Sequence, residues 1–132
     1  MTLECLCGQM SISFDGRPDF VHECNCTLCR KSGAQWSYLA PDAVKVNGET
    51  TGFRRADKAM PAAETHSCSK CAATTHFVLT EAVISEHGNT MMGVNMRLAD
   101  AANLRGMEIR YPDGAAWEGA GEFGYVRSSS TL

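Results

Sequence analysis

Hydrophobic and polar residues alternate along much of the chain in the pattern of short β-strands. In "QMSISF" (9–14) every second residue is apolar, the period of a half-buried strand. "DGRPD" supplies turn residues before a second short strand at 20–22. "WSYLA" (36–40) and "VKVNG" (44–48) predict further strands separated by "PDA", and Asn47-Gly48 is a strong hairpin signal.

The second half of the chain continues this pattern with one exception. "THFVLT" (75–80) and "AVISE" (82–86) are rich in β-forming residues, "EHGNT" predicts a turn, and "MMGVNM" (91–96) predicts another strand. "LADAANLRG" predicts one short helix that ends at Gly106, and "RSSSTL" (127–132) predicts a mobile tail. We therefore expect a mainly β protein with little helix.

Length and composition indicate one domain, spanning residues 1–132. The chain has 132 residues, of which 44% are hydrophobic, enough for one compact core but not for two ordinary domains. We find no linker, no internal repeat beyond the cysteine motifs, and no low-complexity segment before the tail.

Seven cysteines fall into three tight groups, "CLC", "CNCTLC" and "CSKC". An odd number of cysteines argues against a closed disulfide framework. Isolated cysteines are often small core residues, but core packing gives no reason for spacings of one and two residues. Metal binding does, because a short turn directs two thiolates at one ion.

The seven thiolates divide most simply between two zinc ions. The outer pairs, Cys5/Cys7 and Cys68/Cys71, total four and would close a tetrahedral structural site. The remaining three, Cys24, Cys26 and Cys29, would form a second site with one open coordination position, as catalytic zinc sites have.

Other metal arrangements remain open at this point. His22 or His66 would make both sites structural if it supplied a fourth ligand to the group of three. An iron–sulfur cluster is disfavoured because neither of the usual four-cysteine ferredoxin spacings is present.

Charge and hydropathy exclude several classes of partner. The formal net charge is -3 and the basic residues are scattered, which argues against nucleic-acid binding. No apolar run reaches the roughly 18 residues of a membrane span, and "MTLECLCGQMSISF" lacks the features of a signal peptide. We expect a cytoplasmic protein that acts on a small molecule, without nucleic-acid or membrane partners.

The order of the cysteine motifs, with "CLCG" near the start, "CTLCRKSGA" next and "GVNMRLAD" later, resembles the glutathione-dependent formaldehyde-activating enzyme family. This family includes the centromere protein V-like domains.

The resemblance extends over residues 3–117 and implies a β-tent of small antiparallel sheets around two zinc ions. It also implies that Cys5, Cys7, Cys68 and Cys71 hold structural zinc. The triad Cys24, Cys26 and Cys29 would hold the catalytic zinc that contacts the thiol of glutathione. Many members carry histidine directly before the triad, where this chain has Glu23.

The chemistry of a three-thiolate zinc site favours a thiol substrate. Three thiolates leave the zinc complex with a formal charge of -1, which makes it a weak Lewis acid and argues against a simple hydrolase. A thiol bound at the open position would lose its proton and, as a thiolate, could add to formaldehyde. We therefore expect a carbon–sulfur lyase that forms or cleaves S-hydroxymethylglutathione, or a related thiol adduct, with glutathione as co-substrate.

Polar residues after the triad are candidate glutathione contacts. Glutathione carries a net charge of about -1 at neutral pH. Arg30 and Lys31 could pair with its carboxylates, and Gln35 could line the same loop. Arg54 and Arg55 are further cationic candidates, and Glu23 is a candidate proton acceptor, but exposed surface charges explain all three better.

Three alternative functions are compatible with a protein rich in cysteine. A nucleobase deaminase would need H-x-E and P-C-x-x-C, and neither motif is present. A C-x-x-C redox protein would need its motif at the start of a helix, but "CSKC" leads into a β-rich segment. The main alternative is a non-catalytic structural zinc module, which would have no thiol-accessible position on the second ion.

Overall fold

The computed structural model describes residues 1–132 and shows a mainly β protein, with 39% of residues in strands and 17% in helices. The first strands are β1 (Thr2–Glu4), β2 (Ser11–Phe14), β3 (Phe20–His22), β4 (Trp36–Leu39), β5 (Val44–Asn47) and β6 (Thr50–Arg54). The others are β7 (Ala63–Cys68), β8 (Thr74–Leu79), β9 (Met92–Asn95), β10 (Glu108–Pro112) and β11 (Tyr125–Thr131). The helices are α1 (Thr27–Ser32), α2 (Glu81–His87) and α3 (Ala101–Leu104), with 3-10 turns η1 (Pro41–Ala43) and η2 (Met96–Leu98). The predicted fold class, mainly β with little helix, is confirmed.

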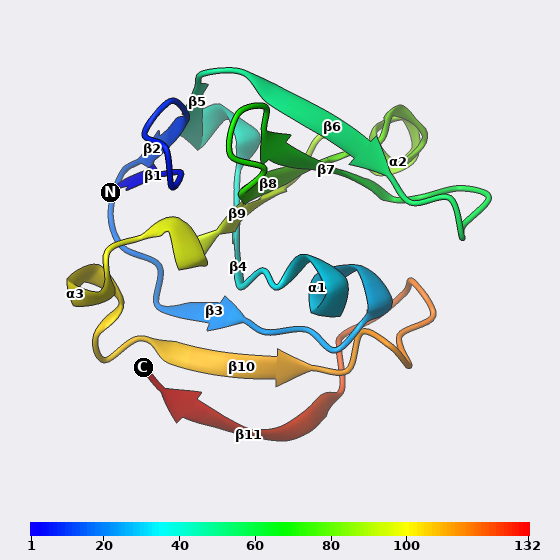
Figure 1. The fold of residues 1–132 in the computed structure, drawn as a ribbon. Coiled ribbons are helices and arrows are strands. Elements are labelled where there is room, and N and C mark those ends of the chain that lie inside the picture. Colours follow the sequence, from blue (N-terminus) through cyan, green and yellow to red (C-terminus); the bar gives the residue numbers. More distant parts are fainter.

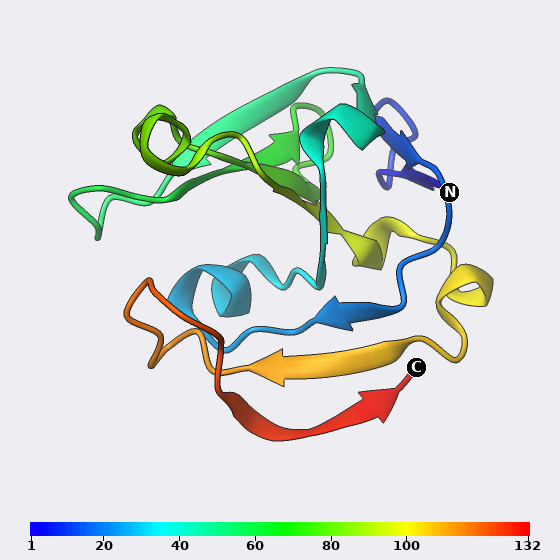
Figure 2. The same ribbon diagram turned by 180° about the vertical axis from the view of Figure 1, so that it is seen from behind.

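The strands form two sheets. A three-stranded sheet has the order β1-β2-β5, and an eight-stranded sheet has the order β11-β10-β3-β4-β9-β8-β7-β6. Neighbouring strands are antiparallel except for β3 and β10, which are parallel. Figures 1 and 2 show α1 between the β6–β9 part of the large sheet and the part formed by β3, β10 and β11. Helix α1 therefore lies where the two halves of the bent sheet face each other.

The hydrophobic core joins the small sheet to the middle of the large one. The apolar residues of "QMSISF" are buried, which confirms the predicted alternation. They pack with the core members Leu3, Val21, Val94, Met96, Met107 and Ile109. Each such side chain contributes about 1.5–3 kcal/mol when it is removed from water. Cys5 and Cys68 belong to this core as well, so one cysteine group sits at its edge.

The segment 82–86, expected to be a strand, is part of helix α2. Its β-forming residues Val83 and Ile84 are only half-buried, while Glu81 occupies the first turn, where a negative charge is favourable. The N–H of Gly88 donates to the carbonyl of Ile84 and ends the helix. The prediction was wrong because β-propensity does not distinguish a short amphipathic helix from a strand.

The tail expected to be mobile forms strand β11 instead. Its side chains are exposed along the whole strand, so no hydrophobic pattern reveals it. Backbone pairing with β10 holds it in place, together with a 2.6 Å hydrogen bond between the hydroxyls of Tyr111 and Ser130. The guanidinium of Arg127 also lies 3.7 Å from the centre of the Tyr111 ring.

Two further local expectations differ from the structure. The chain turns at Asn47-Gly48, but β5 pairs with β2 and β6 pairs with β7, so these strands form no hairpin. The C-x-C-x-x-C motif was expected on a loop, but only its first part is non-helical: Cys26 is the N-cap of α1, and Cys29 lies within the helix. The predicted short helix before Gly106 is present as α3, and the strand at 91–96 is present as β9.

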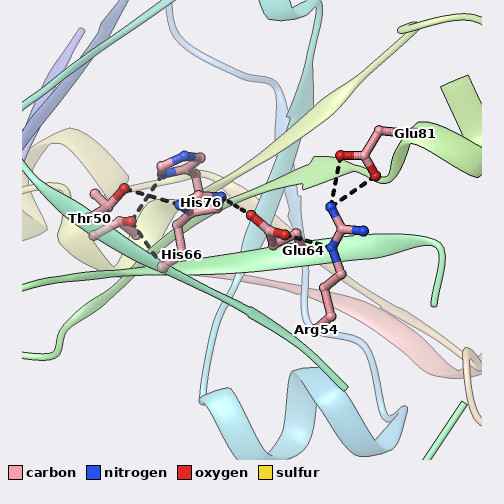
Figure 3. Close-up of polar contacts among 7 residues, drawn as sticks. Thr50, Arg54, Glu64, His66, His76 and Glu81 are labelled. Atoms are coloured by element: carbon pink, nitrogen blue, oxygen red, sulfur yellow. Dashed lines mark hydrogen bonds and ion pairs between the residues drawn. The ribbon is translucent and has the colours of Figure 1, made fainter. Parts of the chain in front are cut away.

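A polar network covers one face of β6, β7 and β8 (Figure 3). The carboxylate of Glu64 accepts a 2.6 Å hydrogen bond from Arg54 and lies 3.1 Å from Nε2 of His66. Arg54 also pairs with Glu81 at 2.9 Å, and Nδ1 of His66 lies 3.0 Å from the hydroxyl of Thr50. These contacts tie α2 to the edge of the sheet.

His76 is buried beneath this network. Its ring stacks on that of His66, with centroids 4.5 Å apart and an interplanar angle of 11°. Burial, and secondarily the charge of His66, lowers the pKa of His76 to about 4. His76 is therefore neutral in the folded protein at neutral pH, whereas it titrates near 6.5 when the chain is unfolded.

The pH dependence of stability tests this burial. Because the folded pKa of His76 is depressed, its contribution is complete above about pH 6.5 and is lost as the pH falls toward 4. Between pH 7 and pH 5 we expect the wild-type protein to lose about 2 kcal/mol more unfolding free energy than His76→Gln. Urea unfolding at matched zinc content measures this difference. Identical pH dependence in the two proteins would contradict the assignment.

Candidate metal and thiol-binding site

Four cysteines from distant parts of the chain meet at the edge of the core. Cys5 and Cys7 lie in the turn between β1 and β2, Cys68 ends β7, and Cys71 lies in the turn before β8. Their four sulfur atoms all lie within 4.8 Å of one another. The structure thus brings together the two outer pairs named from the sequence.

The spacing of these sulfur atoms fits zinc. Cys5 Sγ lies 3.5 Å from Cys7 Sγ and 3.6 Å from Cys68 Sγ, and the Cys7–Cys68 separation is 3.7 Å. Zinc–sulfur bonds of about 2.3 Å in a tetrahedron place sulfur atoms about 3.8 Å apart. All four thiols are free, and the separations are far longer than the roughly 2.05 Å of a disulfide. Four thiolates would fill every position of a tetrahedral ion.

Helix α1 gathers the remaining three cysteines. Cys26 is the N-cap, and its sulfur accepts a hydrogen bond from the backbone N–H of Cys29 (3.5 Å). Cys24 lies just before it, and its sulfur accepts from the N–H of Cys26 (3.4 Å). Gly33, in the left-handed conformation, ends the helix. The same turn that starts the helix therefore places the sulfur atoms of the triad within 4.8 Å of one another.

Trp36 supplies the hydrogen bond to the third sulfur. Its indole N–H donates to Cys29 Sγ at 3.2 Å. The indole is buried and packs edge-on against Phe77, with centroids 5.1 Å apart. Phe77 in turn lies over Gly93, where a Cβ atom would come within 2.0 Å of the ring. This packing fixes the orientation of the indole. Together with the two backbone N–H groups, the indole gives each triad sulfur one hydrogen-bond donor, and such donors stabilise the negative charge of a metal-bound thiolate.

Electrostatics within the triad favour a bound cation. Hydrogen bonds from Cys24 and Cys29 lower the pKa of Cys26, whereas the neighbouring Cys24 and Cys26 raise the pKa of Cys29. Burial, followed by the charges of the triad, also raises the pKa of Tyr38. Three thiolates this close repel one another, and a soft divalent ion such as zinc would relieve that repulsion.

Neither histidine considered as a fourth ligand belongs to the group of three. The ring of His22 packs between Tyr38 and Phe20, with centroids 4.8 and 5.0 Å away. His66 is engaged by Glu64 and Thr50 in the network of Figure 3. The triad therefore offers three ligands where the other group offers four.

A cavity of about 420 Å³ opens beside the triad, between α1 and strands β10 and β11. Cys24 and Cys29 line it, and three arginines, Arg30, Arg97 and Arg127, contribute to its wall. This cavity is therefore rich in positive charge and borders two of the three triad cysteines.

The candidate glutathione contacts lie in different places. Arg30 lines this arginine-rich cavity, whereas Lys31 lines a second cavity on the other side of α1. Gln35 is buried, and its amide donates to Glu23 at 2.6 Å. Glu23 also accepts from Arg97 at 3.1 Å, so Gln35 and Glu23 help to position a cavity arginine.

A loop between β10 and β11 packs over the triad. Asn25, between two triad cysteines, donates to the carboxylate of Asp113 at 2.7 Å and accepts from the N–H of Ala115 at 2.8 Å. These bonds press Gly114 against the triad, where a Cβ atom would lie 2.3 Å from Cys24 Sγ. Only glycine fits there without displacing the sulfur.

Comparison with known proteins agrees with this geometry. The sequence profile of the family described as glutathione-dependent formaldehyde-activating enzyme matches residues 1–111. The chain belongs to this family. The matched region includes both cysteine groups. A comparison with curated proteins found no match.

A solved structure shares the fold of this formaldehyde-activating family member. The crystal structure of a Rhodobacter sphaeroides protein, a structural-genomics target, matches with a TM-score of 0.58 and 22% sequence identity. The match covers 76% of this chain and 89% of that chain. None of the helices here is long and apolar enough to cross a membrane.

Several residues of the site were not identified from the sequence of this family member. Arg97 and Arg127 are far from the triad in the chain; Arg97 lies within "GVNMRLAD", but nothing in that motif indicates a contact with the triad. Asn25 was visible inside "CNC", but its partner loop was not. Gly114 in "PDGAA" reads as an ordinary turn glycine. The pairing of β10 with β3 and β11 brings Gly114 and Arg127 to the triad, and the pairing of β9 with β4 brings Arg97 there.

The contact of Gly114 with Cys24 predicts a selective effect on metal binding. Gly114→Ala should displace Cys24 Sγ or the loop, and the purified protein should fall from about two to about one zinc per chain. The far-ultraviolet circular dichroism should be unchanged, because the other cysteine group is untouched. Gly124→Ala is the control, since nothing lies within 4 Å of a Cβ atom there. Full zinc content in Gly114→Ala would contradict the prediction.

Proposed function

We propose that this protein is a zinc-dependent carbon–sulfur lyase that forms or cleaves S-hydroxymethylglutathione or a related thiol adduct. The observation that carries the proposal is the inequality of the two cysteine groups. One has four sulfur atoms within 4.8 Å of one another, enough to fill a tetrahedral ion, and the other has three beside a cavity lined by arginines. In the proposal, Cys5, Cys7, Cys68 and Cys71 hold structural zinc, and Cys24, Cys26 and Cys29 hold catalytic zinc.

Zinc held by the triad would supply an open coordination position at which the thiol of the substrate loses its proton. The backbone N–H groups of Cys26 and Cys29 and the indole of Trp36 keep the three ligand sulfurs charged and oriented. Gly114 and its loop cover the triad on one side and help to exclude water.

The charge of the cavity supports a substrate with carboxylates. Arg30, Arg97 and Arg127 face it together with one acidic residue, Glu23. Guanidinium groups bind carboxylates through paired hydrogen bonds, and glutathione has two carboxylates. The family description, which names glutathione and formaldehyde, points to the same pair of substrates.

The proposed reaction balances without a redox partner. A carbon–sulfur bond forms between the thiol and the aldehyde carbon, and the proton lost from sulfur is matched by one gained at the carbonyl oxygen. Cleavage is the reverse. A reducing compartment such as the cytoplasm suits a protein with seven free thiols.

Substituting one cysteine in each group should separate the two roles. Cys68 is buried in the core, so Cys68→Ser should lose the structural ion and much of the folded state. Cys26→Ser should keep the fold and one zinc per chain. Thermal unfolding and metal analysis measure both. Equal loss of folding in the two variants would instead indicate two structural sites and a non-catalytic zinc module.

Catalysis can be followed directly at equilibrium. Glutathione and formaldehyde form their adduct spontaneously, so the enzyme should raise the rate of exchange without changing the equilibrium amount of adduct. Two-dimensional exchange NMR on ¹³C-formaldehyde measures that rate. We expect wild-type protein to accelerate exchange and Cys26→Ser to return it to the uncatalysed rate. No acceleration by zinc-loaded wild-type protein would contradict the proposal.

A further inference from the structure

A second cavity, of about 500 Å³, lies on the side of α1 opposite the arginine-rich cavity. It separates α1 from strands β6, β7 and β8. Its lining is unusually rich in hydroxyl groups and carries three charged residues. The charged residues are Lys31, Arg55 and Asp57, and strands β7 and β8 contribute Thr65, Ser67 and Thr74.

Thr65 has a polar atom that the folded chain leaves unpaired. The residue is only 7% exposed, and its hydroxyl oxygen is buried without a hydrogen-bond partner. Side chains alternate along a strand, so Thr65 and Ser67 point toward α1 while Glu64 and His66 join the network on the other face (Figure 3). Buried hydroxyls without partners are costly, so an unpaired one at a cavity wall indicates a ligand contact.

The charges of the cavity leave one cation free. Arg55 is neutralised by Asp57, whose carboxylate accepts two hydrogen bonds from the guanidinium at 2.7 and 2.5 Å. Lys31 makes no ion pair within the chain, so its ammonium is available to a ligand. The three groups together carry one net positive charge. The cavity therefore suits one anionic group that also accepts hydrogen bonds.

This cavity lies close to the triad. Lys31 is on α1, two residues beyond Cys29, on the helix that supplies the triad. Thr27 and Leu28, which lie between Cys26 and Cys29 in the chain, also line the cavity. The cavity and the triad therefore share the first turn of α1.

We propose that this hydroxyl-lined cavity binds one carboxylate of the thiol substrate, with Lys31 as its charge partner and Thr65, Ser67 and Thr74 as hydrogen-bond donors. The inference rests on the proposed function and adds a recognition site to it. Glutathione carries its thiol between two carboxylate ends. The arginine-rich cavity takes one end and the hydroxyl-lined cavity takes the other, so the substrate lies across the start of α1.

Binding of two thiols to the zinc-loaded protein tests this inference. Glutathione carries carboxylates, whereas cysteamine presents a thiol without any. Thr65→Val and Lys31→Gln should each weaken glutathione binding by about tenfold, the effect of losing a hydrogen bond or charge partner of a carboxylate. Cysteamine binding should not change. Lys58→Gln, an exposed lysine outside the cavity, is the charge control and should bind both thiols as wild type does.

A stability measurement separates a ligand contact from a folding role. Thr80 is buried like Thr65, but its hydroxyl donates to the carbonyl of Pro61 at 2.9 Å. Thr80→Val should lower the melting temperature by a few degrees, because it removes a hydrogen bond. Thr65→Val should leave the melting temperature unchanged or raise it, because the hydroxyl that it removes has no partner in the fold.

The outcomes distinguish the inference from the function on which it rests. Equal affinity of Thr65→Val and wild type for glutathione would overturn the inference alone, as would equal weakening of glutathione and cysteamine. A lowered melting temperature for Thr65→Val would also overturn it. If wild-type protein bound neither thiol, the proposed function would fail together with the inference.

Discussion

The structure depends on bringing four thiols from two sheets within a few ångströms of one another. Cys5 and Cys7 belong to the small sheet, whereas Cys68 and Cys71 flank strands of the large one, more than sixty residues later in the chain. Thiolates at this distance repel unless a cation lies between them. A metal ion here would therefore contribute to folding directly, since the unfolded chain offers no such site. The junction lies at the edge of the core, where Cys5 and Cys68 pack with its apolar side chains.

The other three cysteines, Cys24, Cys26 and Cys29, have a different environment from these four. They sit at the start of a six-residue helix rather than in the core, and they border a charged cavity. The fold holds them with N–H donors to sulfur and with the glycine loop over Cys24. It adds no fourth protein ligand. The difference between a group of four cysteines and a group of three is the basis of the proposed thiol chemistry.

Cysteine spacing made the metal groups predictable, because short C-x-C and C-x-x-C turns constrain sulfur geometry locally. Alternation likewise predicted β2, whose apolar residues Ile12 and Phe14 are buried. Strand β11 was missed because every side chain on it is exposed, so that no hydrophobic alternation marks it, and it is held by backbone pairing with β10 and by contacts with Tyr111. Arg97, Arg127 and Gly114 reach the site through the pairing of distant strands. Local pattern carries no information on such contacts.

In the proposed function, the two cysteine groups differ because only the triad of Cys24, Cys26 and Cys29 has a position for an outside thiol. Cadmium-113 NMR of the cadmium-substituted protein distinguishes the two groups, because the resonance of each ion reports its own sulfur ligands. We expect two resonances, of which only the one lost in Cys26→Ser shifts when glutathione is added. Two resonances that both ignore glutathione, or a single resonance, would contradict it.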